Sequence, residues 1–235
     1  MRKIAIIGAM AEEVERLASH LENRQTRQHA GSTFHSGHLH GVEVVILQSG
    51  IGKVNAAVGT TQLLEAYQPD AVINTGSAGG FGVDLDVGDV VISSEVRHHD
   101  VDAVVFGYEY GQVPQMPAAY APDPHLVNVA RECIEGLGEL RVAEGLICTG
   151  DIFMADKAAV DQARERFPSM LAAEMEAAAI AQTCHLYDCP FVVIRALSDI
   201  AGKESDLSFQ AFIEKAATHS AMMVEAMVKR LGTAS

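Results

Sequence analysis

Short apolar runs alternate with segments of helical periodicity along the whole chain. Runs with the character of buried strands lie at 3–9, 41–50, 71–80, 89–96, 141–149 and 190–197. Apolar residues recur at helical spacing at about 11–23, 52–67, 123–136, 155–166, 175–187 and 208–232. Continuous apolar strands that alternate with helices are typical of a largely parallel or mixed sheet covered by helices on both faces. The pattern predicts an α/β fold.

No linker, repeat or low-complexity tract divides the 235 residues, so a single domain spanning 1–235 is expected. The longest irregular stretch is 98–122, which holds three of the seven prolines and four of the thirteen aromatic residues. A loop of this length in a compact domain is usually functional or disordered. Its aromatic residues favour a function, either as a lid or as a contact with another subunit.

The net charge of -14 restricts the class of ligand. Nucleic-acid backbones and anionic membrane surfaces are bound by clustered Lys and Arg, whereas the seventeen basic residues here are scattered. No stretch approaches the roughly 20 apolar residues that span a bilayer. The expected partner is therefore a small molecule that is not highly anionic, with neither nucleic acid nor membrane involved.

The cysteines and the first apolar run bear on the cellular compartment. The four cysteines form no CxxC pair, and a chain of this length does not need disulfides, so we expect reduced thiols. The apolar run after the basic start MRK is too short for the h-region of a signal peptide, and acidic residues follow it at once. Both features favour a cytoplasmic protein.

The segments that directly follow the predicted strands are candidates for a ligand site, because ligands of open α/β sheets bind beyond the carboxyl ends of the strands. These segments are 9–13, 49–53, 75–80, 149–154, 174–176 and 198–199. We expect them to converge on one pocket.

Three glycine-rich turns, GAMAEE, SGIGKVNA and NTGSAGG, follow predicted strands. None matches GxGxxG or GxxxxGKS/T, so neither a dinucleotide site nor a P-loop is expected. Helix N-termini at such turns can bind anions, but Glu12 and Glu13 in the first turn would repel phosphate. Histidines at 35, 38, 40, 98 and 99 suggest a metal site at first sight, yet zinc needs a fourth ligand at workable spacing, and hydrogen-bonded histidines are the better interpretation.

Two groups of charged residues fall at predicted strand ends. Glu174 and Glu176 flank Met175 within a run of alanines, where a strand is expected to become a helix. Buried carboxylates need donors, which the two hydroxyls of a ribose would supply, although the helix dipole alone also favours acids at a helix N-terminus. Arg195 ends another apolar run and Asp199 follows it, so chemistry and a structural Arg–Asp salt bridge remain alternatives there.

Seven stretches, in order along almost the whole chain, closely resemble the methylthioadenosine/S-adenosylhomocysteine nucleosidase family of the nucleoside phosphorylase superfamily. They are IIGAMAEEV, SGIGKVNAA, INTGSAGG, FGYEYGQVP, GD.F, EMEA.AIA and RALSD.A…LSF. The resemblance implies a three-layer α/β/α sandwich around a twisted central mixed β-sheet, working as a homodimer. It also implies hydrolysis of the N-glycosidic bond of 5′-methylthioadenosine and S-adenosylhomocysteine to adenine and the 5-thioribose product, in methionine salvage and methyl-cycle detoxification.

The resemblance assigns catalytic roles to the matching positions. Asp199 would be the general acid that protonates adenine N7, and Ser198 would orient it. Glu13 would be the general base that positions the attacking water, with Arg195 and Ser77 nearby. No metal or organic cofactor is required for this chemistry.

A set of substrate contacts follows from the same resemblance. Glu176 would hold the ribose hydroxyls, and Phe153 would stack on adenine while the backbone of Met154 reads its edge. The other residues expected to line the pocket are Met10, Ile51, Met175 and Phe209.

The resemblance also gives the 98–122 loop a function. Phe106, Tyr108 and Pro114 would reach into the site of the partner subunit of the homodimer and cover the 5′-thio substituent. The departures from the family are local. Ala11 stands where many members carry a third acid, and the segment IFMADK after Asp151 varies between members, so side-chain contacts there are less secure than backbone contacts.

Three alternatives to this hydrolase remain. A nucleoside phosphorylase binds a phosphate dianion and needs several basic groups beside the ribose, whereas only Arg195 and Lys53 are at hand here; dependence of activity on phosphate would identify it. A futalosine-type nucleoside hydrolase would share the same pocket residues. A nucleoside-binding protein without activity would not need both a general acid and a general base, so the presence of Glu13 and Asp199 disfavours it.

Overall fold

The computed structural model describes residues 1–138, 140–201 and 205–233, without the side chains of 205–208 and 210. The strands are β1 (Lys3–Gly8), β2 (Glu22–His29), β3 (Ser32–Leu39), β4 (Val42–Gln48), β5 (Ala71–Gly80), β6 (Val90–His98), β7 (Val142–Thr149), β8 (Met170–Glu174) and β9 (Phe191–Ile200). The helices are α1 (Ala11–Ser19), α2 (Lys53–Tyr67), the 3-10 turn η1 (Val104–Phe106), α3 (Pro124–Gly136), α4 (Lys157–Arg166), α5 (Ala177–Leu186) and α6 (Ser205–Thr233).

All strands belong to one mixed sheet with the order β2-β3-β4-β1-β5-β8-β7-β6-β9. β1 pairs in parallel with β4 and β5, and β5 pairs in parallel with β9. β9 also pairs with β6 in antiparallel orientation, so β5, β8, β7, β6 and β9 form a closed ring of pairings. The ring brings the ends of β5, β8 and β9 close together, which matters for the site below.

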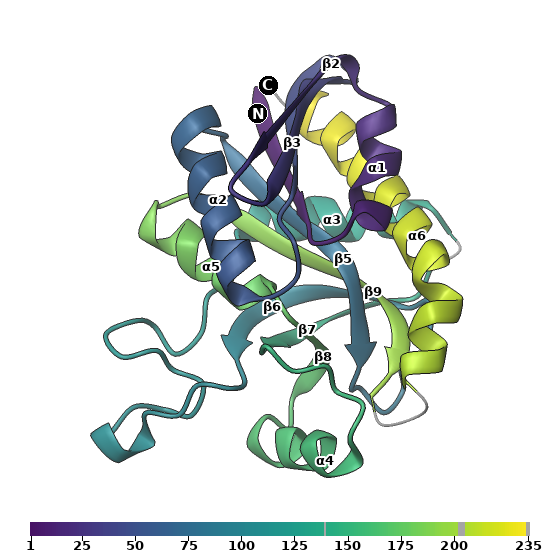
Figure 1. The fold of residues 1–235 in the computed structure, drawn as a ribbon. Coiled ribbons are helices and arrows are strands. Elements are labelled where there is room, and N and C mark those ends of the chain that lie inside the picture. The colour runs from purple at the N-terminus through teal and green to yellow at the C-terminus, as the bar shows by residue number, and fades with distance from the viewer. Residues whose placement is uncertain (139, 202–204, 234–235) are drawn as a thin grey trace.

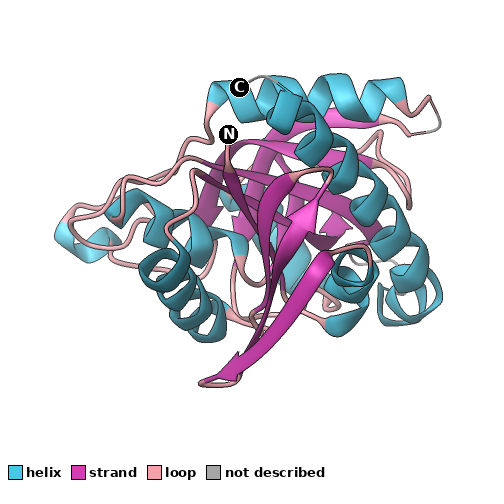
Figure 2. Ribbon diagram, turned by 90° about the horizontal axis from the view of Figure 1, so that it is seen from above, coloured by secondary structure: helices cyan, strands magenta, loops and turns pink. Residues whose placement is uncertain are grey.

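Both faces of the sheet are buried along its central strands, as the continuous apolar runs predicted. Along β1, Ile4 and Ile6 belong to one core cluster and Ala5 and Ile7 to the other, because successive side chains of a strand point to opposite faces. The first cluster includes side chains of α1, α3 and α6, and the second includes those of α2 and α5. Figures 1 and 2 show these helices on the two sides of the sheet. The α/β/α sandwich is confirmed.

The hairpin of β2 and β3 differs from the prediction. The helix expected over 11–23 ends at Ser19, and the chain then enters β2, an edge strand. All eight residues of β2, ENRQTRQH, are exposed. Neither face of β2 packs on the core. Its sequence therefore lacks the alternation of apolar and polar residues that predicts a strand.

The 98–122 loop joins β6 to α3 and projects from the body of the molecule (Figure 1). Its base is fixed by a pair of backbone hydrogen bonds between Val96 and Tyr120, both of 2.9 Å. Its end is fixed by Asp123, whose side chain caps α3 by accepting from the amide of Leu126 at 2.9 Å. No helix in the described part of the chain is long and apolar enough to cross a bilayer.

Candidate active site

A cavity of about 220 Å³ lies where the predicted strand-end segments meet. Its walls come from all six segments and from α6. The lining residues are Ala9, Met10, Glu13, Ile51, Ser77, Ala78, Gly79, Phe153, Ala173, Met175, Glu176, Ser198, Asp199 and Phe209. The predicted convergence on one pocket is confirmed.

Glu13 is held at the turn between β1 and α1. One carboxylate oxygen, Oε2, accepts from the amides of Ala9 at 2.8 Å and Met10 at 3.1 Å. The other, Oε1, accepts from the amide and the hydroxyl of Ser77 at 3.0 and 3.1 Å. Glu13 is the third residue of α1 and returns to the amide of the N-cap residue, as in a capping box. Four donors therefore fix a nearly buried carboxylate at the cavity wall.

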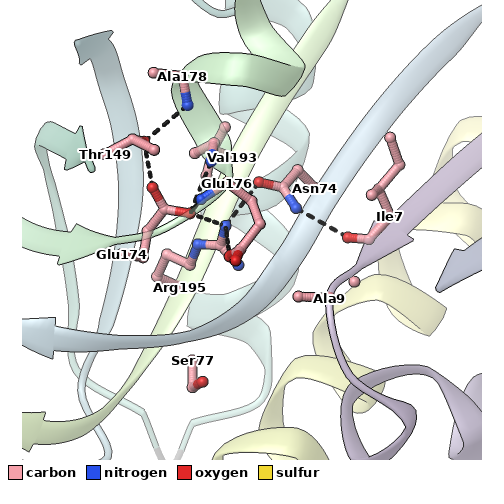
Figure 3. A network of polar contacts seen from close by, with 12 residues as sticks. Ile7, Ala9, Asn74, Ser77, Thr149, Glu174, Glu176, Ala178, Val193 and Arg195 are labelled. Atoms are coloured by element: carbon pink, nitrogen blue, oxygen red, sulfur yellow. Dashed lines mark hydrogen bonds and ion pairs between the residues drawn. The ribbon is translucent and has the colours of Figure 1, made fainter. Parts of the chain in front are cut away.

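Glu174 does not line the cavity but joins a buried network behind it (Figure 3). It accepts from the amides of Glu176 at 2.9 Å and Ala177 at 2.8 Å, and from the hydroxyl of Thr149. It also forms an ion pair with Arg195. Glu174 therefore combines the structural role expected of an acid at a helix N-terminus with neutralisation of a buried cation.

Arg195 is only 1% exposed and lies behind the cavity wall. Its Nη2 donates to Asn74 Oδ1 at 2.9 Å, and Asn74 in turn donates to the carbonyl of Ile7 at 3.0 Å. The ion pairs of this arginine are thus with Glu174 and, at 4.0 Å, with Glu176, and the alternative of a structural Arg195–Asp199 bridge does not describe its packing. Its predicted contact with substrate or water stays a prediction.

Glu176 lines the cavity. It has fewer polar contacts than Glu174, which lies beside it in the same network (Figure 3). Its Oε1 accepts from the amide of Gly52 at 2.8 Å, and its Oε2 lies 4.0 Å from Arg195 Nη2. Burial, followed by the negative charge of Glu174, raises the pKa of this carboxyl above its usual range. The side chain needs donors, and the cavity is where a ligand can supply them.

Ser198 and Asp199 lie near the end of β9 and line the cavity. Between β5 and β9 the register shifts by one residue, since Ala78 pairs with Leu197 and Gly79 with Asp199. This irregularity redirects the end of the strand, which is a common use of a bulge at a functional site. The hydroxyl of Ser198 donates to Asp199 Oδ1 at 2.9 Å. A side chain at Gly79 would begin 3.2 Å from Asp199 Oδ2, so glycine keeps space beside that oxygen.

The apolar part of the cavity contains two aromatic rings. Phe153 and Phe209 meet edge to face, with centroids 6.0 Å apart and planes at 78°. Phe153 and Ile51 are about half exposed, so they form the mouth. Flat faces of this kind bind aromatic ligands by stacking. The side chain of Met154 packs in the separate cluster around α4 and does not line the cavity; the predicted role of its backbone stays a prediction.

The ionisable groups that line the cavity are acidic. Glu13, Glu176 and Asp199 line it, and none of its described lining residues is Lys or Arg. Lys53, considered above as a cation for phosphate, instead bonds to Asp100 Oδ1 at 2.7 Å and does not line the cavity. The positive charge of Arg195 is matched by Glu174. A phosphate dianion in the cavity would therefore lie beside carboxyl groups, with no lysine or arginine among the described lining residues to neutralise it.

Two of the histidines singled out in the sequence have side-chain hydrogen-bond partners. His35 contacts Thr26 Oγ1 at 3.0 Å, and His98 contacts Gln182 Oε1 at 3.1 Å. Over 1–138, 140–201 and 205–233, no group of three or more His, Cys, Asp or Glu side chains is arranged to hold a metal ion.

The 98–122 loop does not contribute to the cavity of its own chain, as judged from the described lining residues. Phe106 is 80% exposed and Pro114 is exposed as well, whereas Tyr108 is partly buried. The structure thus leaves these three side chains outside the site, where their predicted contact with a partner subunit stays a prediction.

Sequence reasoning missed several residues that position the site. Asn74, within β5, and Thr149, at the end of β7, are buried polar residues that hold Arg195 and Glu174. Their signal was a polar side chain at the carboxyl end of an apolar run, where a buried polar group needs a partner. Small residues also line the cavity without any chemical signature: Ala9, Ala78, Gly79 and Ala173.

The chain is similar over its whole length to proteins of one kind. A family model described as the phosphorylase superfamily matches residues 3–229. The 5′-methylthioadenosine/S-adenosylhomocysteine nucleosidases of Anoxybacillus flavithermus and Bacillus subtilis are 59% and 57% identical to it. Each alignment covers 97% of this chain, and 98% and 99% of those relatives.

Solved structures agree with this likeness. The structure of such a nucleosidase from Colwellia psychrerythraea, in complex with adenine, superposes with a TM-score of 0.95 at 53% identity, covering 98% of this chain and 96% of that one. The Neisseria meningitidis enzyme, in complex with methylthio-immucillin-A, gives a TM-score of 0.96 at 47% identity, covering 98% and 100%.

Proposed function

We propose that this chain, which belongs to the phosphorylase superfamily and within it to the 5′-methylthioadenosine/S-adenosylhomocysteine nucleosidases, cleaves both nucleosides with water through Asp199 and Glu13. The products are adenine and the 5-thioribose. The observation that carries the mechanism is the placement of these two carboxyl groups on the walls of one cavity that also contains Glu176.

Asp199 serves as the general acid. Adenine is a poor leaving group as an anion, so its departure from C1′ requires a proton on N7. Oδ1 of Asp199 accepts the hydroxyl of Ser198, which orients the carboxyl group. Oδ2 lies beside the space that the missing side chain of Gly79 leaves. The two aromatic rings at the mouth hold the adenine plane in position for this transfer.

Glu176 binds the ribose. Its buried carboxyl group accepts one hydrogen bond, from the Gly52 amide, and therefore has room for more donors. The 2′- and 3′-hydroxyls of the ribose provide two. As the glycosidic bond breaks, positive charge develops on the sugar ring, and the negative charge of Glu176 stabilises that charge more than it stabilises the bound substrate. Glu174 and Arg195 fix the start of α5 and so orient Glu176.

Glu13 acts on the water. The attacking water donates to the Glu13 carboxylate, which takes its proton as oxygen bonds to C1′. The proton that Glu13 takes from water balances the one that Asp199 gives to adenine. Glu13 then releases its proton to solvent and Asp199 takes one up, which restores the initial state of the enzyme. The negative lining supports water as nucleophile, since phosphate would be repelled.

A homodimer completes the site in this proposal. Large apolar side chains are exposed both at the mouth and on the 98–122 loop: Ile51, Val54, Val104, Val105 and Phe106. Exposed apolar patches commonly mark interfaces. A partner's loop placed over the mouth would bury both groups and bring Phe106, Tyr108 and Pro114 to the 5′-thio substituent. The four unbridged cysteines support a cytoplasmic setting.

The experiment that tests the mechanism is the Asp199→Asn substitution. Adenine release from methylthioadenosine is expected to fall by about 10³-fold, because general acid catalysis contributes about 10²–10⁴-fold, while calorimetry still detects binding of the substrate. Asp161→Asn, on the exposed face of α4, is the control and retains full activity. Near-normal turnover by Asp199→Asn would remove Asp199 from the proposed role.

A further inference from the structure

The C-terminus of α5 brings two cysteines together. The amide of Cys189 donates to the carbonyl of Cys184 at 2.9 Å, and the amide of Asp188 donates to that of His185 at 3.3 Å. Asp188 has a φ of 51°, in the left-handed region. These are the two hydrogen bonds and the left-handed residue of a Schellman motif, in which the third-last helical residue and the second residue after the helix cap pack against each other. In this chain both of those residues are cysteines.

The two thiols interact and differ in character. Their interaction raises the pKa of Cys184 and lowers that of Cys189. The Cys189 thiol also donates weakly to the carbonyls of Pro69 at 3.9 Å and Pro190 at 3.7 Å. Burial and the charge of Asp70 oppose the lowering at Cys189 without reversing it. Cys189 is therefore the better nucleophile of the pair, and Cys184 stays a protonated thiol beside it.

Access also distinguishes the two sulfurs. Both cysteines border one surface groove, but Cys184 has no exposed surface, whereas Cys189 is half-buried and borders a second groove as well. One groove lies against 119–123 and the other against 64–70. A small oxidant in either groove meets Cys189 first, with Cys184 directly behind it.

We propose that Cys184 and Cys189 form a redox modification site that closes to an intramolecular disulfide on exposure to a peroxide. The Cys189 thiolate attacks one oxygen of hydrogen peroxide, the O–O bond breaks, and hydroxide leaves and is protonated to water. Cys189 is then a sulfenic acid. The sulfur of Cys184 attacks the Cys189 sulfur, the S–S bond forms, and the sulfenic oxygen leaves as water with the Cys184 proton. The pair loses two electrons, and peroxide becomes two waters.

This site is separate from the cavity. α5 begins next to Glu176, and Cys184 is the eighth of its ten residues, which places that thiol roughly 12 Å further along the helix axis. The inference therefore does not depend on the proposed mechanism. The other cysteines provide internal controls, because Cys133 lies on α3 and Cys148 on β7, and burial raises the pKa of each thiol.

The test is to treat the full-length protein with hydrogen peroxide, quench it, and digest it without reductant. Mass spectrometry should find the peptides of Cys184 and Cys189 linked. The thiol count after unfolding should fall from four to two and return to four with dithiothreitol. Cys133→Ser should form the same link. Persistence of four free thiols, or a link that involves Cys133 or Cys148 instead, would overturn the proposal.

Two variants separate the steps. In Cys184→Ala the resolving thiol is absent, so Cys189 should accumulate as sulfenic acid and be labelled by dimedone. In Cys189→Ser, Cys184 should remain a free thiol at the same peroxide dose. Oxidation of Cys184 at the wild-type rate in that variant would contradict the assignment of Cys189 as the attacking sulfur.

Discussion

The substitution Glu176→Gln should stabilise the fold while abolishing most of the activity. Glutamine has the same shape and keeps the oxygen that accepts from the Gly52 amide. It removes a buried charge that has one hydrogen-bond donor and lies near the negative charge of Glu174. In catalysis, the neutral side chain loses two charge-assisted hydrogen bonds to ribose, worth about 1.5–3 kcal/mol each, so kcat/KM should fall by about 10²–10⁴-fold.

The stability gain has a predicted pH dependence. The folded-state pKa of Glu176 lies above its unfolded value, so the wild-type protein has its full stability below that unfolded value, near pH 4.3. It loses stability as the pH rises through the folded-state pKa, because only the unfolded chain then readily ionises this group. Each pKa unit of difference corresponds to about 1.36 kcal/mol. After allowance for relaxation and water penetration, we expect a gain on the order of 2 kcal/mol at neutral pH and above.

Thermal unfolding measures this difference directly. A gain of that size corresponds to roughly 4–8 °C in Tm for a chain of this length, and it should shrink toward zero as the pH falls to about 4. Glu174→Gln is the matched control: it breaks the buried pair with Arg195 and should cost about 3 kcal/mol. A lower Tm for Glu176→Gln, or a Tm difference independent of pH, would refute the reasoning.

Three further substitutions test other parts of the site. Glu13→Gln should lower kcat by about 10²–10³-fold with adenine affinity retained, as steady-state kinetics and adenine titration would show; unchanged kcat would exclude Glu13 as the base. Gly76→Ala should lower the free energy of unfolding by about 1–3 kcal/mol, because the new methyl group would clash with Glu13 and Arg195. Gly136→Ala is the control, since no atom lies within contact distance of its added methyl group. Equal melting temperatures for the two variants would contradict this prediction. Phe106→Ala should raise KM for methylthioadenosine about tenfold by removing roughly 1.4 kcal/mol of apolar contact across the dimer, and an unchanged KM would separate the loop from the partner's site.

The location of the site could be predicted from the sequence because the strands that lead to it are buried on both faces. Continuous apolar runs such as the one in β1 mark such strands, and their ends mark the cavity. β2 could not be found in this way, because its residues are all exposed and its pairing with β3 depends on the backbone. The prediction of a helix over 11–23 was therefore wrong beyond Ser19, where α1 ends.

The sequence could not predict which of the two neighbouring glutamates pairs with Arg195 behind the cavity and which one lines it. Glu174 and Glu176 share the same local surroundings, and the partners that separate them come from elsewhere: Arg195 and Thr149 bind the first, and Gly52 binds the second. The closed ring of strand pairings creates these contacts, and no local pattern reports them. The Schellman contact at the end of α5 is local, yet its meaning depends on the side-chain contact that the fold provides.

The most direct test of the account measures adenine release from methylthioadenosine in phosphate-free buffer, repeated with phosphate added and with the sugar product identified. The acidic cavity predicts the same rate in both buffers, with methylthioribose as the product. Activity that appears only with phosphate, and that yields the sugar 1-phosphate, would contradict water as the nucleophile and Glu13 as its base.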